Sequence, residues 1–132
     1  MIVVDASAVV AFVTGQRPDG AWVREQLWDQ RLLSTHVMPA EVHNALRRME
    51  LSGDFSTADT RDARAEFLGI RFELAPFRPY ANRVWELRRN LSGYDAWYVA
   101  LAEALDCPLV TIDHRLSRAV GPECTFVTPP DA

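Results

Sequence analysis

The sequence has 132 residues, with 18 acidic and 14 basic side chains and a formal net charge of −4. This length suits one compact domain with its own core, so we predict a single domain over residues 1–132. The negative charge argues against a chain that coats nucleic acid non-specifically. No apolar run approaches the roughly 18 residues of a membrane span and no basic segment precedes the first apolar run, so we expect a cytosolic protein without a membrane anchor.

All 14 basic residues are arginines, because the sequence contains no lysine. A Walker-type phosphate loop and Schiff-base chemistry both need a lysine, so both are excluded. Arginine pairs such as Arg47-Arg48 are typical of a solvated helix face, although guanidinium groups also bind phosphates bidentately. Cys107 and Cys124 flank predicted strands and lack the close spacing of four soft ligands, so we interpret them as structural thiols.

Strand and helix patterns alternate along the first half of the chain, and Pro and Gly mark the turns between them. The predicted elements are a strand at 2–5, helices at 7–13 and 19–30 with a turn at 14–18 between them, a strand near 32–34, a helix that Pro39 opens and Ser52-Gly53 ends, a helix near 57–69 and a strand at 72–75. This alternation is typical of an α/β fold.

The second half of the chain supplies the helix that we expect at the centre. Apolar residues recur at helical spacing over 80–91, and the segment after Ser92-Gly93 is apolar almost all round as far as Leu105. Only about two residues join this segment to a predicted strand at 108–112, so the helix must run from the carboxyl edge of the sheet back to its amino edge. The predicted architecture is a three-layer α/β/α domain with a mainly parallel central sheet.

Four acidic residues stand at the ends of predicted elements. Asp5 and Asp113 each end an apolar strand, Asp95 begins the apolar helix, and Glu41 follows Pro39 in the first turn of its helix. Any one of them alone is explained by helix capping or by the helix dipole. Capping alone does not explain why acids, rather than Ser or Asn, stand both at the ends of two strands and at the start of the central helix. Clustered carboxylates repel one another unless they hold a hard cation, so we predict that these four residues bind Mg²⁺ or Mn²⁺.

Two hydroxyl groups lie two residues from these acids. Ser7 follows Asp5 and Thr111 precedes Asp113, positions from which each can hydrogen-bond a carboxylate or a bound water. A plain helix cap and a plain strand threonine explain the same positions. We therefore predict only a supporting role for both.

The same residues carry a family resemblance that spans almost the whole chain. The four segments are Val3-Val4-Asp5-Ala6-Ser7-Ala8, Pro39-Ala40-Glu41-Val42, Tyr94-Asp95-Ala96-Trp97-Tyr98-Val99-Ala100-Leu101-Ala102 and Leu109-Val110-Thr111-Ile112-Asp113-His114-Arg115-Leu116. They resemble the motifs of the PIN-domain ribonucleases, specifically the VapC-type toxins of bacterial toxin–antitoxin modules. The resemblance implies a Mg²⁺- or Mn²⁺-dependent endoribonuclease that forms a homodimer and is held inactive by a cognate antitoxin. Trp28 and Phe67 lie off the main stripes of their helices and, if exposed together, would form an apolar groove for an antitoxin helix.

The predicted chemistry is hydrolysis of an RNA phosphodiester by metal-activated water, with Arg115 offsetting charge on the phosphoryl oxygens. Unpaired RNA is the expected substrate, because the grooves of duplex RNA are poorly readable. One alternative is a metal-free ribonuclease that uses His36, His43 or His114 as acid and base. The other is a phosphate-binding or receiver-like module, which the lack of lysine and of a Gly-rich loop disfavours.

Overall fold

The centre of the molecule is a five-stranded sheet in which all neighbouring strands are parallel. The structure, a computed structural model, describes residues 1–16 and 18–130, so Arg17 of the predicted turn and the last two residues of the predicted domain lie outside it. The elements are β1 (Ile2–Val4), α1 (Ala6–Thr14), α2 (Asp19–Leu27), β2 (Leu32–Thr35), α3 (Met38–Leu51), α4 (Thr57–Gly69), β3 (Glu73–Ala75), η1 (Arg78–Tyr80), α5 (Ala81–Glu86), α6 (Gly93–Leu105), β4 (Leu109–Val110), α7 (His114–Ser117) and β5 (Phe126–Val127).

The strand order, β3-β2-β1-β4-β5, determines where a site forms. From β1 the chain adds β2 and β3 on one side and later β4 and β5 on the other. The carboxyl ends of β1 and β4 therefore border the point where the strand order reverses, which is the usual ligand position in open parallel sheets. Val4 pairs with Val110, so the next residues on the two strands, Asp5 and Thr111, come side by side.

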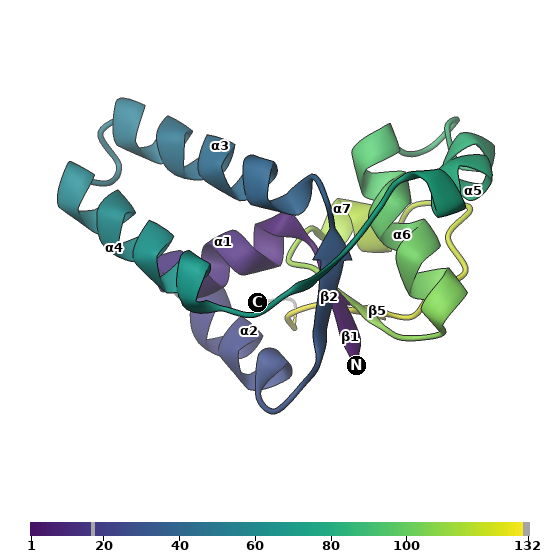
Figure 1. Ribbon diagram of the computed structural model, residues 1–132, viewed down its shortest axis with the longest axis horizontal. Coiled ribbons are helices and arrows are strands. Elements are labelled where there is room, and N and C mark those ends of the chain that lie inside the picture. Colours follow the sequence, from purple (N-terminus) through teal and green to yellow (C-terminus); the bar gives the residue numbers. More distant parts are fainter. Residues whose placement is uncertain (17, 131–132) are drawn as a thin grey trace.

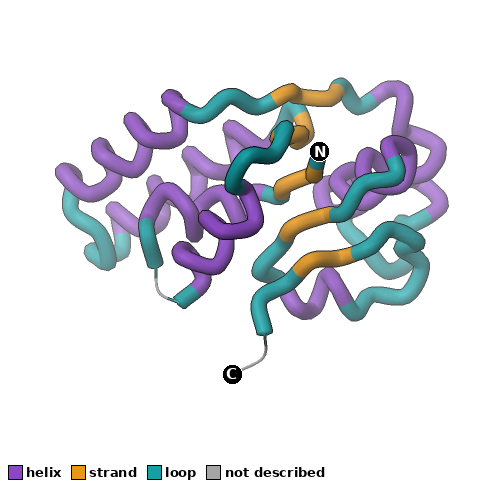
Figure 2. The backbone as a smooth tube through the Cα atoms, turned by 90° about the horizontal axis from the view of Figure 1, so that it is seen from below, coloured by secondary structure: helices purple, strands orange, loops and turns teal. Residues whose placement is uncertain are grey.

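Helices cover both faces of the sheet and complete the predicted three-layer architecture. Helices α1 to α4 lie on one side and α5 and α6 on the other (Figure 1), and a second view shows the strands running between the two groups (Figure 2). Helix α6 packs directly on β1, β2 and β4, and its residues 96–102 are all buried. The predicted central helix is thus confirmed. Across residues 1–16 and 18–130, no helix combines the length and the apolar character that a membrane crossing requires.

Residues at the helix ends explain why several elements begin and stop where they do. Ser56 and Asp59 form a reciprocal capping box at the start of α4, and Ser92 accepts a hydrogen bond from the Asp95 N–H at the start of α6. Gly20 has a packing role instead. It lies where α2 crosses α1, and a Cβ at this position would come within 2.8 Å of the Ala11 carbonyl oxygen.

Three elements are clearly shorter than predicted. The predicted helix 19–30 ends at Leu27, because Trp28 leaves the helical backbone with a ψ of 127° and Asp29 then adopts a left-handed φ of 56°. The predicted helix over 80–91 is a 3₁₀ turn followed by α5, which ends at Glu86. The predicted strand 108–112 pairs only at Leu109–Val110. The short elements α7 and β5 complete the C-terminal part of the described chain.

The proposed apolar groove between Trp28 and Phe67 is wrong. Trp28 is 80% exposed, but Phe67 is only 6% exposed, because its ring stacks on Phe72 and contacts the edge of His43. The sequence pattern puts Phe67 off the main stripe of its helix. In the structure α4 packs against α1 and α3, and Phe67 lies in the core. The two aromatic side chains therefore do not share an exposed surface.

Candidate active site

Asp5 is the buried carboxylate of the site, with 4% of its surface exposed. It is the N-cap of α1, where its Oδ1 accepts hydrogen bonds from the Ala8 N–H at 3.0 Å and from the Ser7 hydroxyl at 2.6 Å. Its Oδ2 accepts from the Thr111 hydroxyl. Burial outweighs these donors and, with a smaller contribution from Asp95, raises the pKa of Asp5 to about 6.

The two predicted supporting hydroxyls hold the ends of β1 and β4 together. The Ser7 Oγ accepts a hydrogen bond from the Ile112 N–H at 3.3 Å, and the Thr111 Oγ1 accepts from the Asp113 N–H at 3.0 Å. Ser7 and Thr111 also approach each other at 3.3 Å. The loop after β4 is thereby tied to the first turn of α1, and this network fixes both oxygens of Asp5.

Glu41 approaches from a different element, the first turn of α3. It is half-buried, and its Oε1 accepts a hydrogen bond of 2.8 Å from the hydroxyl of Tyr98. Burial and the charge of Asp95 raise the pKa of Glu41, while the Tyr98 bond opposes that shift. Tyr98 is itself almost fully buried, and burial next to Glu41 raises the pKa of its phenol so that the hydroxyl remains a donor.

Asp95 and Asp113 line the open side of the site, together with Arg115. Asp113 is the N-cap of α7 and accepts from the backbone N–H groups of Arg115 and Leu116. Burial and the neighbouring charge of Asp113 raise the pKa of Asp95, and Arg115 opposes this shift. All three residues line a pocket of about 670 Å³.

Asp95 is the common neighbour of the other acids. Its charge raises the pKa values of Asp5 and Glu41, and the charge of Asp113 raises the pKa of Asp95. The set is open: within the part of the chain that the structure describes, no three His, Cys, Asp or Glu side chains meet closely enough to form a ready-made metal site. The donors are nevertheless all oxygens, and a buried carboxylate with a raised pKa gains from a nearby cation. Mg²⁺ fits such a set, because it usually binds through one or two carboxylates and keeps several waters, through which the remaining acids can hold it.

Tyr98 is the site residue that the sequence reasoning missed. The sequence signal was its position three residues after Asp95, which places both on the same face of a helix. The apolar pattern of the central helix gives the Tyr98 hydroxyl no role, although a buried tyrosine hydroxyl usually needs a hydrogen-bond partner.

The three histidines lie on separate elements. His36 is exposed between β2 and α3, and His114 begins α7. His43 of α3 uses both ring nitrogens, one within 2.7 Å of the Pro39 carbonyl and the other accepting from Arg64 at 3.2 Å. An acid and base pair of histidines therefore has no support in these contacts. Cys107 and Cys124 are free thiols whose pKa values are raised by burial, as expected of structural cysteines.

Comparison with known proteins matches this geometry to one family. The sequence profile of the PIN domain covers residues 2–122. Ribonuclease VapC9 of Mycobacterium tuberculosis is 40% identical over 98% of this chain and 99% of its own length. Ribonuclease VapC1 of the same species is 40% identical over 92% of each chain. A toxin-antitoxin complex from Klebsiella pneumoniae contains a chain of the same fold, with a TM-score of 0.69, 17% identity and full coverage of both chains. Because the profile and the VapC relatives extend over both strand ends that carry the acids, the chain belongs to the PIN domain family and to its VapC group.

Proposed function

We propose that this protein is an endoribonuclease of the VapC type, the toxin of a toxin–antitoxin pair, and that Mg²⁺ or Mn²⁺ supports its reaction. The observation that carries the proposal is the position of Asp5, a buried carboxylate at the switch point of a PIN-family sheet, within the electrostatic reach of Asp95. The relatives that are named ribonucleases support the activity, and the oxygen-only donor set supports the metal.

Each residue of the site has a proposed role. Asp5, Asp95 and Asp113 would hold the cation, and Glu41 would bind it directly or through water. When bound, the cation polarises the scissile phosphate and lowers the pKa of a water. Ser7 and Thr111 fix the orientation of Asp5, and Tyr98 fixes that of Glu41. Arg115 faces the same pocket as Asp95 and Asp113, where its guanidinium offsets charge on the phosphoryl oxygens.

The proposed partners are an RNA substrate, a cognate antitoxin and a second copy of this chain. The toxin-antitoxin complex from Klebsiella pneumoniae, which has the same fold, supports the antitoxin. The homodimer and the cytosolic location stay predictions. Co-expression with the adjacent small open reading frame should relieve growth arrest caused by this chain. Arrest that the second reading frame leaves unchanged would argue against the toxin assignment.

The direct test is cleavage of a structured RNA by the purified protein, with Mn²⁺ in one arm and a chelator in the other. We expect cleavage only with Mn²⁺, and products that carry a 5′-phosphate because water is the nucleophile. Asp5→Asn, Asp95→Asn and Asp113→Asn should each abolish cleavage, whereas Glu41→Gln should reduce it less if Glu41 binds through water. Cyclic-phosphate products in the presence of chelator would instead indicate a metal-free mechanism.

A further inference from the structure

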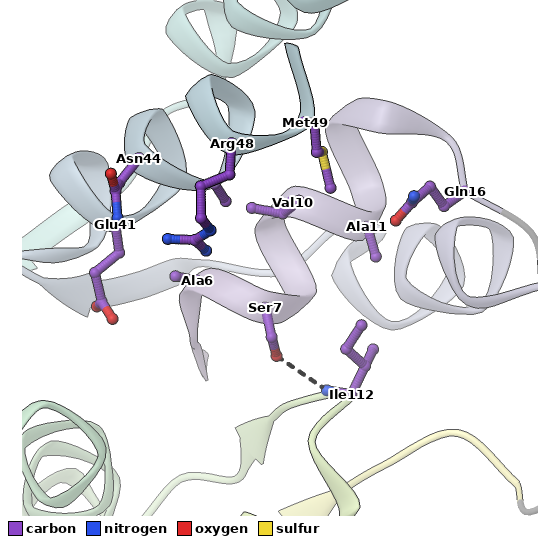
Figure 3. Close-up of a pocket in the computed structure, with 11 residues that line it drawn as sticks. Ala6, Ser7, Val10, Ala11, Gln16, Glu41, Asn44, Arg48, Met49 and Ile112 are labelled. Atoms are coloured by element: carbon purple, nitrogen blue, oxygen red, sulfur yellow. Dashed lines mark hydrogen bonds between the residues drawn. The ribbon is translucent and has the colours of Figure 1, made fainter. Parts of the chain in front are cut away.

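A pocket of about 400 Å³ lies between α1 and α3, beside the carboxylates (Figure 3). Its volume is in the range of small-ligand sites. Ser7 and Glu41 belong both to this pocket and to the candidate active site. A polymer whose phosphate lies at the carboxylates can therefore continue directly into the pocket.

The two walls of the pocket differ in chemistry. Ala6, Val10 and Ala11 of α1 are small and apolar, and their size leaves the space open. The opposite wall carries the polar side chains of Glu41, Asn44 and Arg48, which follow one another along one face of α3, beside the apolar Ala45 and Met49.

Arg48 places a positive charge in this pocket. Its side chain is exposed and extends from α3 toward α1 (Figure 3). Seven residues separate it from Glu41, which corresponds to about 10 Å along the helix axis. In a chain with a net charge of −4, a backbone phosphate beside the acidic site needs a local cation, and a guanidinium matches phosphate geometry. This charge favours nucleic acid over an apolar peptide as the occupant.

We propose that the pocket between α1 and α3 binds the nucleotide next to the scissile phosphate of a single-stranded RNA. The base lies against Ala6 and Val10, the amide of Asn44 hydrogen-bonds the base edge, and the Arg48 guanidinium binds the adjoining phosphate. Unpaired bases are recognised through such apolar contacts and edge hydrogen bonds. This inference rests on the proposed ribonuclease function and adds a substrate subsite to it.

The charge of Arg48 is tested by Arg48→Gln, with Arg47→Gln as the matched control. Arg47 is also exposed on α3 but lines a different pocket, toward α4. Binding of an unstructured fluorescent RNA in chelator and its cleavage in Mn²⁺ are measured over a range of salt concentrations. We expect Arg48→Gln to weaken both about tenfold, the size of one lost charge-assisted contact. The slope of log affinity against log salt should fall by about 0.7, the value for one phosphate of a single strand. Arg47→Gln should behave like the wild type.

The base contact is tested by Asn44→Leu, which removes the amide and fills the pocket. The base frequencies on either side of each cut are read from the 5′-phosphate ends of a mixed RNA pool. We expect the preference at one position next to the cut to change in Asn44→Leu and to persist in Arg47→Gln. Thermal melts of all variants verify that each one is folded.

The outcomes separate this inference from the proposed function. If the wild type cleaves RNA and both Arg48→Gln and Asn44→Leu behave like the control, the subsite is overturned and the function stands. RNA binding that depends on Arg48 without any cleavage would overturn the function and keep the pocket as an RNA-binding site. A wild-type protein that neither binds nor cleaves RNA would remove both. If Arg48→Gln weakens only binding of the co-expressed partner, the ligand of the pocket is a protein and the subsite is overturned.

Discussion

Asp5 combines two tasks at one residue, because it caps α1 and also presents a carboxylate to the site. The donors that surround it, the Ala8 N–H and the Ser7 and Thr111 hydroxyls, favour its charged form. Burial nevertheless has the larger effect on its pKa. The fold therefore holds the residue in position, and a nearby cation would stabilise its buried negative charge.

The raised pKa of Asp5 predicts a specific pH dependence of the metal-free protein. Between its ordinary pKa of 3.8 and the folded value of about 6, the folded protein retains a proton that the unfolded chain releases. The free energy of unfolding therefore falls as pH rises through this window, by about 3 kcal/mol in total, since each pH unit between the two pKa values is worth about 1.4 kcal/mol. Urea denaturation in chelator at about pH 4.5 and pH 7.5 measures about 2 kcal/mol of this loss, because pH 4.5 already lies above the ordinary pKa.

Asp5→Asn isolates the contribution of this one group, because asparagine keeps the cap but cannot titrate. The difference in free energy of unfolding between the wild type and Asp5→Asn should change by most of this loss between about pH 4.5 and pH 7.5. The same pH dependence in both proteins would show that Asp5 titrates normally when folded.

Tyr98→Phe should impair the reaction through Glu41. The substitution keeps the ring in the core and removes the hydroxyl that donates to Glu41 Oε1, so Glu41 loses its fixed orientation. We expect cleavage to fall about tenfold and the Mn²⁺ concentration for half-maximal activity to rise, as is usual when a ligand loses its supporting partner. Tyr94→Phe, which removes a hydroxyl from an exposed position of the same helix, is the control. Equal activity of the two variants would leave Tyr98 with a packing role alone.

At the scale of elements, the sequence predicts well where the periodic pattern is long. The helix near 57–69 and the apolar helix that ends at Leu105 agree with α4 and α6, because each has several turns of pattern and a capping residue. The strand β5 pairs over only two residues, too few for a periodicity to register, and β4 is predicted at 108–112 but also pairs over only two residues. Asp5 and Asp113 are predictable because they follow apolar strands, whereas the contact between Tyr98 and Glu41 joins two helices that no local pattern relates.

The crossing of α1 and α2 depends on Gly20. An alanine there would place its Cβ 2.8 Å from the Ala11 carbonyl and close to the backbone of Gly15, so one helix would have to move. We expect Gly20→Ala to destabilise the protein by about 1–3 kcal/mol, the usual cost of overpacking. Gly69→Ala is the control, because a Cβ at Gly69 meets nothing within 4 Å at the end of α4. Thermal denaturation compares the two, and a Gly20→Ala protein as stable as the control would mean that the helices separate without cost.

At the scale of the whole molecule, a bound cation should stabilise the fold. Mn²⁺ at about a hundred times its dissociation constant contributes roughly 2.7 kcal/mol, or several degrees in melting temperature. Asp95→Asn should raise the melting temperature of the metal-free protein, because it relieves repulsion from Asp113, and should shrink the Mn²⁺-induced rise.

Ser92→Ala is the contrasting variant, since it removes the cap of α6 and leaves the acids in place. It should cost about 1 kcal/mol in the metal-free protein and keep the full response to Mn²⁺. If Asp95→Asn instead lowers metal-free stability and leaves the response intact, Asp95 is a cap and not a ligand.

The pairing of β1 with β4 also has a consequence for the time at which the protein becomes active during synthesis. Asp5 is bonded to Thr111, 106 positions further along the chain, and Asp113 follows two residues later. A ribosome that adds roughly 5–20 residues per second needs about 5–20 s to pass from the first of these acids to the last. Throughout that interval the nascent chain has its first strand but lacks the strand that completes the site. Translation therefore delays completion of the proposed active site, and a partner synthesised nearby can bind during those seconds.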